Sequence, residues 1–105
     1  MGDCATIPKM HCSVAKTIKI IGSKWTILLL HQLLEGNKRF GELQRALPGI
    51  SPKTLSQRLK ELEKEKLITK KIFAEVPLHV EYYLTKKGES VQEIVKLMEE
   101  WGNLS

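Results

Sequence analysis

Four hydrogen-bonding side chains share one side of the stretch PGISPKTLSQRLKELE, residues 48–63, if that stretch is helical: Lys53, Ser56, Gln57 and Lys60. Their separation of three, one and three positions brings them to a single helix face. This face carries amino, hydroxyl and amide donors and no acid, a combination that suits phosphate groups and the edges of nucleic-acid bases. The plainer interpretation is an amphipathic surface helix whose charged face is simply solvated.

The same stretch contains strong helix signals. Ser51 is a favourable N-cap, and Pro52 occupies the first helical position, where its missing N–H is harmless. Leucines at positions 55, 59 and 62 recur at helical spacing and predict a buried face opposite the polar one. The glutamates at positions 61, 63 and 65 gather at the C-terminal end, away from the N-terminal half of the polar face.

Size and charge narrow the classes of function. The chain of 105 residues has room for one domain with a modest core, and it carries a net charge of +5 with a pI near 9.3. Between Ser51 and Lys71 there are seven Lys or Arg residues against three Glu residues, so this segment holds most of the surplus. A basic surplus favours a polyanionic partner, nucleic acid before membrane.

No segment predicts export or a membrane span. The longest apolar run, Trp25 to Leu30, is far shorter than the roughly 20 residues that a transmembrane helix needs. Residues 1–10 lack the charged start and apolar block of a secretory signal. We therefore expect a cytoplasmic protein whose two cysteines, Cys4 and Cys12, are reduced.

The other helices follow from hydrophobic periodicity. Residues 1–12 show none and are expected to form a flexible N-terminal arm, whereas residues 13–105 form one domain. A first helix starts at Ser13 and stops at Gly22, a second runs from Lys24 to about Glu35 behind a Ser23 cap, and a short third helix covers residues 40–47. The second helix is apolar on nearly all sides, so it belongs in the middle of the core.

After Lys66 the period of the pattern changes from 3.6 to 2. Residues 67–76 and 79–85 alternate apolar and polar side chains on either side of Pro77 and predict a β-hairpin. Thr85 then caps a last helix whose apolar stripe ends at Trp101. The predicted fold is mainly α with a small β-hairpin wing, in the order helix, helix, helix, turn, helix, strand, strand, helix.

A short helix, a tight turn and a helix with a buried leucine stripe make a helix-turn-helix, and a hairpin directly after them makes the winged form. An α-helix fits the major groove of B-DNA, where lysine suits guanine, glutamine suits adenine and serine suits several bases. The side chains expected near base edges are Lys53, Thr54, Ser56, Gln57 and Lys60. Of these, Thr54 lies close to the inward face, where it would only pack or support the cap.

From about Cys12 to Gly102 the chain resembles the HxlR-type winged helix-turn-helix transcription regulators. The resemblance rests on several motifs in order: the leading cysteine, GSKW at 22–25, RF at 39–40, LPGIS at 47–51, VEY at 80–82 and LT at 84–85. It implies a sequence-specific DNA-binding regulator that acts as a homodimer on a palindromic or inverted-repeat operator.

The resemblance also implies that the N- and C-terminal helices form the dimer interface. The wide apolar stripe of the last helix suggests the same from the residues themselves, since little chain is left to cover it. The alternative is that this helix packs only on its own domain. The interface residues expected are Val14, Ile18, Val91, Ile94, Val95, Met98 and Trp101.

Phosphate contacts are expected from Arg39, Arg58, Lys70, Lys71 and His79. The family usually shows a second proline and then arginine or lysine at the tip of the wing, whereas this sequence has Leu78 and His79. A neutral histidine is a weaker phosphate ligand than arginine, and it gains charge only as the pH falls toward roughly 6.5. Strand alternation points Lys70 and Lys71 to opposite faces, so at most one of them should help.

Cys12 matches the cysteine that many of these regulators use to sense oxidants, quinones or aldehydes. Thiols near a helix N-terminus are often more reactive, which fits that role. The other interpretation of Cys12 is a small, partly buried structural residue. The set Cys4, His11 and Cys12 lacks the paired spacing of a zinc site, so no metal is expected.

Two other classes of function are alternatives. A winged helix can dock a partner protein without binding DNA, and a steep loss of binding with added salt would distinguish DNA from such a partner. An enzyme is not expected, because the sequence has no nucleophile–base set, glycine-rich phosphate loop or paired catalytic acids. No cofactor is expected, and no motif identifies the small molecule or oxidant that would act as effector.

Overall fold

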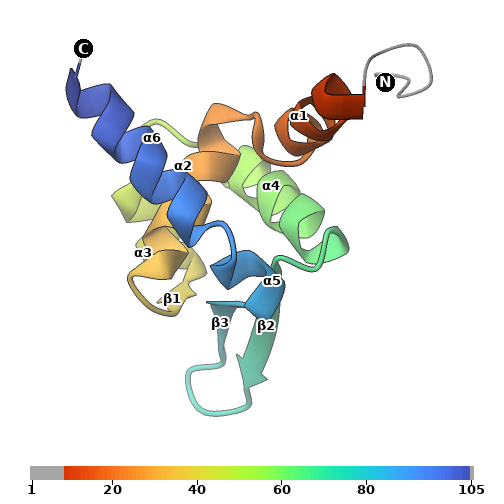
Figure 1. The fold of residues 1–105 in the computed structure, drawn as a ribbon. Coiled ribbons are helices and arrows are strands. Elements are labelled where there is room, and N and C mark those ends of the chain that lie inside the picture. Colours follow the sequence, from red (N-terminus) through yellow and green to blue (C-terminus); the bar gives the residue numbers. More distant parts are fainter. Residues whose placement is uncertain (1–8, 105) are drawn as a thin grey trace.

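The computed structural model describes residues 9–104 (Figure 1). Its helices are α1 (Lys9–Ile21), α2 (Lys24–Leu34), α3 (Phe40–Ala46), α4 (Pro52–Lys64), α5 (Lys86–Glu89) and α6 (Gln92–Leu104). Its strands are β1 (Lys38–Arg39), β2 (Ile68–Phe73) and β3 (His79–Leu84), which form one antiparallel sheet in the order β1-β3-β2. The prediction of a mainly helical fold with a small β element is confirmed.

The core is built around α2 and α4. Leucines from each helix are fully buried and pack in one cluster with residues of α3, the start of β2 and α6. Each such leucine contributes about 1.5–3 kcal/mol relative to an exposed one, so this cluster holds α4 firmly against α2. The cluster leucines of these two helices are Leu29, Leu30, Leu33, Leu55, Leu59 and Leu62. No helix within residues 9–104 has the length and apolar character to cross a membrane.

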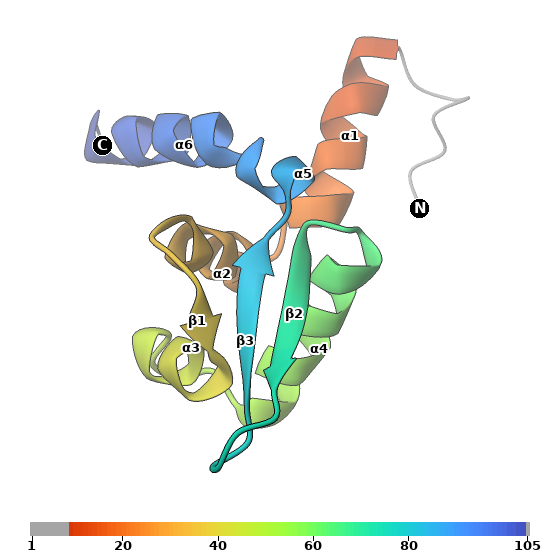
Figure 2. The same cartoon turned by 90° about the horizontal axis from the view of Figure 1, so that it is seen from below.

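The terminal helices α1 and α6 project away from this core (Figures 1 and 2). At its C-terminal end α1 inserts Ile21 into the core, and α6 inserts Val95 near its N-terminal end. Figure 2 places both helices at the opposite end of the molecule from the hairpin tip and the N-terminal half of α4.

The chain passes from α4 into β2 through a left-handed residue. Lys66 has a φ of 62°, its N–H donates to the Glu63 carbonyl over 2.9 Å, and the Leu67 N–H donates to the Leu62 carbonyl over 3.0 Å. These two bonds make a Schellman motif, which satisfies the last carbonyls of the helix. The motif turns the chain sharply, so that β2 starts directly beside the end of α4.

Thr85 ties the end of β3 to the same turn. Its N–H donates to the Leu67 carbonyl over 3.0 Å, and its hydroxyl donates to the Lys66 carbonyl over 2.6 Å. The hydroxyl oxygen also accepts from the Gly88 N–H over 3.0 Å and so caps α5. We name this meeting point of α4, β2, β3 and α5 the wing junction; it consists of Lys66, Leu67, Thr85 and Gly88.

Three features of the structure differ from the sequence predictions. The first helix begins at Lys9 and not at Ser13, so Cys12 lies inside it; residues 1–8 of the expected arm lie outside the described residues. The strand β1 was not predicted, because two residues are too short to show a period of 2. The last helix is divided into α5 and α6, and the break re-aims α6 so that Val91 and Val95 enter the core.

The wing junction generates a first prediction. A Cβ atom on Gly88 would lie 2.0 Å from the Leu67 carbonyl oxygen and 2.9 Å from Leu84 Cδ2, so Gly88→Ala must separate α5 from the turn. Overpacking of this kind costs about 1–3 kcal/mol or more of unfolding free energy. Urea unfolding followed by circular dichroism measures this loss.

The matched control is Gly41→Ala in α3, where the added Cβ meets only Arg45 Nη1 at 3.5 Å. Alanine is a better helix former than glycine, so this variant should be unchanged or more stable by about 0.5–1 kcal/mol. Equal stability of Gly88→Ala and the wild type would contradict the close packing at the junction.

Candidate nucleic-acid interface

The outward face of α4 is the most distinctive polar surface of the molecule. Because the three leucines of α4 are buried, the residues on the other side of the helix are exposed: Lys53, Ser56, Gln57 and Lys60. The structure thus brings together the four donors that the sequence placed on one helix face. Gly49, with a φ of +94°, forms the tight turn that precedes the helix, a conformation that favours glycine.

Thr54, which was expected near base edges with these donors, lies instead in contact with the N-cap of the helix. Its N–H donates to Ser51 Oγ over 3.1 Å, and its hydroxyl oxygen accepts from the Ser51 hydroxyl over 3.0 Å. Ser51 therefore caps α4 as predicted, and Thr54 supports that cap from the half-buried edge of the polar face.

Arg58 does not lie with the exposed donors of α4. Its side chain is 27% exposed, and its Nη1 lies 2.9 Å from Glu61 Oε1 in an ion pair on the side of α4 that faces α1 and α2. The phosphate contact expected of Arg58 stays a prediction, but Arg58 does not share the outward face with Gln57. The reason is angular: residue 58 follows Gln57 by about 100° around the helix and so turns away from the outward face.

The hairpin has two different faces. In the pairing of β2 with β3, Lys70 lies opposite Tyr82 and Lys71 lies opposite Glu81. Because successive side chains of a strand point to opposite faces, the two lysines lie on different faces of the hairpin. The Lys70 face continues from Ile68 and Leu84 on the core side of the sheet, whereas the Lys71 face carries Glu81. Burial, and secondarily the Glu63 carboxylate, raises the pKa of the Tyr82 phenol, so Tyr82 stays neutral beside Lys70.

His79 is already engaged within the hairpin. The side chain is only 12% exposed and stacks on Phe73, with ring centroids 4.7 Å apart. Nδ1 lies 3.5 Å from Glu75 Oε1, and Nε2 lies 3.2 Å from Glu81 Oε2. The phosphate contact expected of His79 stays a prediction; in this structure both ring nitrogens lie beside carboxylates of the same chain. Both acids are close in the sequence: Glu81 lies two residues further along β3 and so on the same face of the strand, and Glu75 lies four residues before His79.

Arg39 remains available on the surface. It is exposed at the start of α3, and its N–H donates to Glu42 Oε1 over 2.8 Å at that helix end. In the sheet, Glu81 of β3 lies opposite Arg39 of β1 on one side and opposite Lys71 of β2 on the other. The carboxylate of Glu81 accepts a hydrogen bond from the Tyr83 hydroxyl over 3.1 Å and lies 3.2 Å from His79 Nε2, and its negative charge lowers the positive potential on that face of the hairpin.

A second surface, apolar in character, lies on the terminal helices. On α6 the exposed side chains that recur at helical spacing are Ile94, Leu97, Met98, Trp101 and Leu104, and on α1 they are Val14 and Ile18. Trp101 is 72% exposed, and Ile18 is 61% exposed. We call this set the apolar terminal surface. Leu97 and Leu104 were missed from the sequence, although both continue the three- and four-residue spacing that starts at Ile94.

Two residues that were expected at a dimer interface are instead in the core of this chain. Val91 and Val95 are each 7% exposed and pack in the central cluster. The alternative interpretation, that the last helix packs on its own domain, therefore holds for its N-terminal part. The break before α6 decides this, because it turns these two valines inward.

Cys12 is half-buried in the first turns of α1 and forms a disulfide, so the expectation of a reduced thiol does not hold in this structure. The only other cysteine of the sequence, Cys4, lies outside the described residues, as does the side chain of His11. Within the described part of the chain, no three His, Cys, Asp or Glu residues are grouped in a way that could hold a metal ion.

Comparison with known proteins gives a consistent result. Residues 20–105 match the HxlR-like helix-turn-helix family. A Fusobacterium mortiferum protein that carries the provisional name regulatory protein MalR is 46% identical over 95 residues, which are 90% of this chain and 90% of that protein. An uncharacterized HTH-type transcriptional regulator of Methanothermobacter thermautotrophicus is 43% identical over 103 residues, covering 98% of this chain and 79% of its own length.

Solved structures agree with the sequence relatives. The redox regulator HypR in its oxidized form superimposes with a TM-score of 0.85 at 37% identity, over 90% of this chain and 97% of that one. The match therefore covers the helix-turn-helix, the hairpin and most of the terminal helices. The chain belongs to the HxlR-like helix-turn-helix family of transcriptional regulators.

Proposed function

We propose that the protein binds an inverted-repeat operator as a homodimer, with the N-terminal half of α4 in the major groove. The observation that carries this proposal is the outward face of α4, where four exposed donors lie together without an acid. Acidic side chains would be repelled by phosphate, and the glutamates of α4 lie toward its far end. In a two-fold dimer the two α4 helices would enter grooves roughly 34 Å apart, or a multiple of that distance.

The roles of the donors follow from their chemistry. Gln57 offers the paired donor and acceptor that match adenine, and the lysines offer donors to the acceptors of guanine. Ser56 is short and adds a single hydrogen bond close to the helix. We assign direct base contact to Gln57 and Lys53, and contact with base or phosphate to Lys60.

Beside α4, we assign the wing contact to Lys70. Lys70 lies on the face of the hairpin opposite to Glu81, and this face continues toward the side on which β2 packs against α4. Arg39 is the exposed cation that flanks α3, so it is assigned to phosphate on the other side of the helix-turn-helix. Lys70 and Arg39 would position the protein without reading sequence.

The apolar terminal surface supports the dimer. Large exposed side chains at helical spacing on α6 form a contiguous apolar face, and a monomer would leave it in water. Such faces mark sites of association, and two-fold pairing would bury the same face of both copies. The helices that carry it project from the end opposite the hairpin tip, so pairing would leave α4 and the wing open to DNA (Figure 2).

Redox control through Cys12 is the finer part of the proposal. Cys12 forms a disulfide in this structure, and it lies in α1, the helix that also carries Val14 and Ile18 of the apolar terminal surface. The relative HypR is named as a redox regulator, with a structure in its oxidized form. Formation and reduction of a bond at Cys12 would therefore act on a helix of the proposed dimer.

The DNA-reading role is tested by Gln57→Ala. Fluorescence anisotropy with the duplex upstream of the protein's own coding sequence, at fixed salt and with random DNA as competitor, should show a loss of about 1–3 kcal/mol on the operator. Discrimination at one base pair should relax, and random DNA should bind as before. Lys70→Gln should instead weaken both DNAs alike and reduce the salt slope by about one.

The matched control for this measurement is Gln92→Ala, an exposed glutamine at the start of α6 that lies away from α4. Equal losses on operator and random DNA for Gln57→Ala would contradict base reading. Binding that does not respond to salt would favour the alternative, a winged helix that docks a partner protein.

The dimer is tested by Met98→Glu, which places a charge in the middle of the apolar terminal surface. Sedimentation equilibrium should show dimerisation weakened by at least roughly tenfold, because an interface would have to bury an unpaired carboxylate. Lys96→Glu, which adds a carboxylate to another side of α6, should leave the association unchanged. A wild type that sediments as a monomer at all concentrations would refute the homodimer.

Redox control is tested with Cys12→Ser. Oxidation by diamide should change the operator affinity of the wild type and not that of Cys12→Ser. Cys4→Ser distinguishes a bond between the two cysteines, which it would abolish, from chemistry at Cys12 alone. An equal response of wild type and Cys12→Ser to the oxidant would rule out the sensor role.

A further inference from the structure

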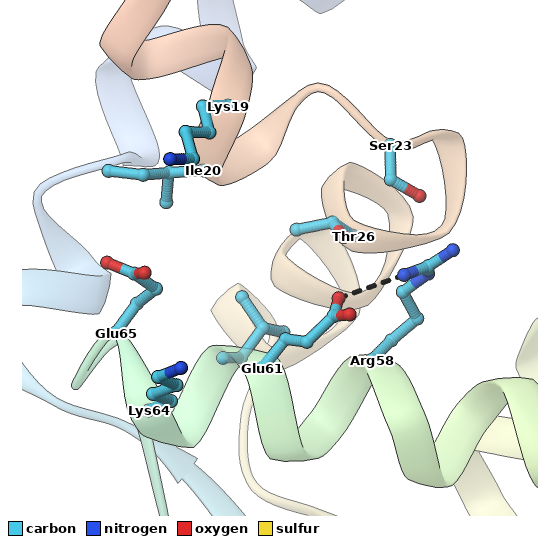
Figure 3. Close-up of a pocket in the computed structure, with 9 residues that line it drawn as sticks. Lys19, Ile20, Ser23, Thr26, Arg58, Glu61, Lys64 and Glu65 are labelled. Atoms are coloured by element: carbon cyan, nitrogen blue, oxygen red, sulfur yellow. Dashed lines mark hydrogen bonds and ion pairs between the residues drawn. The ribbon is translucent and has the colours of Figure 1, made fainter. Parts of the chain in front are cut away.

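A cavity of about 340 Å³ lies between α1, α2 and α4, on the flank of α4 that carries Arg58 (Figure 3). This volume is at the lower end of the range of small-molecule sites, roughly 300–1,000 Å³. The lining residues are Lys19 and Ile20 of α1, Ser23 and Thr26 at the start of α2, Arg58, Glu61, Leu62 and Lys64 of α4, and Glu65 directly after it. None of these residues has a part in the assigned base or phosphate contacts.

Arg58 is the most informative group in this cavity. Its ion pair with Glu61 uses only Nη1, at 2.9 Å. Its Nε is buried and, alone among the buried side-chain nitrogens and oxygens of residues 12–104, lacks a hydrogen-bond partner. A buried donor without an acceptor is unfavourable, so an acceptor oxygen that reached Nε would remove this cost.

The other groups that line the cavity indicate which kind of molecule would fit it. Three cations, Lys19, Arg58 and Lys64, stand against the carboxylates of Glu61 and Glu65, and Glu61 is already paired with Arg58. Ile20 and Leu62 offer an apolar wall. The hydroxyl of Ser23 makes no capping hydrogen bond to α2. A small molecule with one carboxylate and an apolar body fits this combination, because guanidinium groups bind carboxylates through paired hydrogen bonds.

We propose that this cavity binds a small organic carboxylate, with the carboxylate on Arg58 and the apolar body against Ile20 and Leu62. The site joins α1, which carries part of the apolar terminal surface, to α4, whose outward face carries the exposed donors. A molecule that contacts both helices stabilises one arrangement of them over others, and it thereby shifts the population toward that arrangement. An effect on DNA affinity rests on the function proposed above, whereas binding of the carboxylate does not.

The experiment is an NMR titration of the full, ¹⁵N-labelled chain with benzoate, and with benzamide as the uncharged control of the same shape. Benzoate should shift the amide signals of Ile20, Ser23, Thr26 and Leu62 in a saturable way. Benzamide should bind at least about tenfold more weakly, since it lacks the charge-assisted bonds to the guanidinium. Equal binding of both compounds, shifts centred elsewhere, or no saturable shift at about 10 mM benzoate would overturn the proposal.

Variants separate the site from a general effect of charge. Arg58→Gln should weaken benzoate binding about tenfold or more, and Arg58→Lys, which keeps the charge but lacks the planar donor pair, should lose part of it. Arg45→Gln removes an exposed arginine of α3 outside the cavity and should bind benzoate as the wild type does. If Arg58→Gln does not fold, as judged from its spectrum, Arg58→Lys decides, and unchanged binding by that variant contradicts the assignment.

A second arm repeats the anisotropy titration with saturating benzoate. A severalfold change in operator affinity in the wild type, absent in Arg58→Lys, supports coupling between α1 and α4. If benzoate binds but operator affinity does not change, the proposed coupling between α1 and α4 is refuted and the carboxylate site still stands. A protein that binds benzoate but no DNA refutes the proposed function and not the carboxylate site.

Discussion

The orientation of the hairpin relative to α4 depends on the wing junction. Beyond Ile68 the strand β2 is exposed for most of its length, so the hairpin has no core of its own to hold it. The Schellman bonds after α4 and the two bonds donated by Thr85 fix its base, and Lys87 Nζ adds a bond to the Glu65 carbonyl at 3.0 Å. Gly88 permits this closeness because a side chain there would strike the Leu67 carbonyl. The base of the wing is thus tied directly to the C-terminal end of α4.

Three sides of the helix α4 face three different environments. Its leucines fill the core, its exposed donors face solvent, and Arg58 turns toward α1 and α2. The 3.6-residue period of a helix makes this division, since positions about 100° apart meet different neighbours. Because α4 is one stiff helix, a displacement of its cavity side would also displace the side that carries the exposed donors. This is the physical basis of the proposed connection between the cavity and DNA binding.

The terminal helices extend a small core outward. A chain of this size buries limited apolar surface. The helix α1 enters the core at its C-terminal end, and α6 enters it through Val95 and contacts α2 as far as Glu99, whose Oε2 lies 3.8 Å from His31 Nε2. Their outer faces carry large apolar side chains that the single chain does not cover. Pairing of two copies would place this area in a second core, at about 25 cal/mol for each Å² removed from water. The exposed apolar surface thus supports the proposed homodimer.

The sequence by itself determined the elements with strong periodicity: the central helix α2, α4 with its Ser51 cap and leucine stripe, and the hairpin with its change from period 3.6 to 2. It also determined which donors share the outward face of α4, because that follows from helix geometry alone. Only the tertiary structure decided the neighbours of each side chain. Lys70 lies opposite Tyr82 through strand register, Arg58 faces a cavity that α1 closes, and Val91 and Val95 enter the core. Such contacts join residues that are far apart in the chain, so packing, and not local periodicity, sets them.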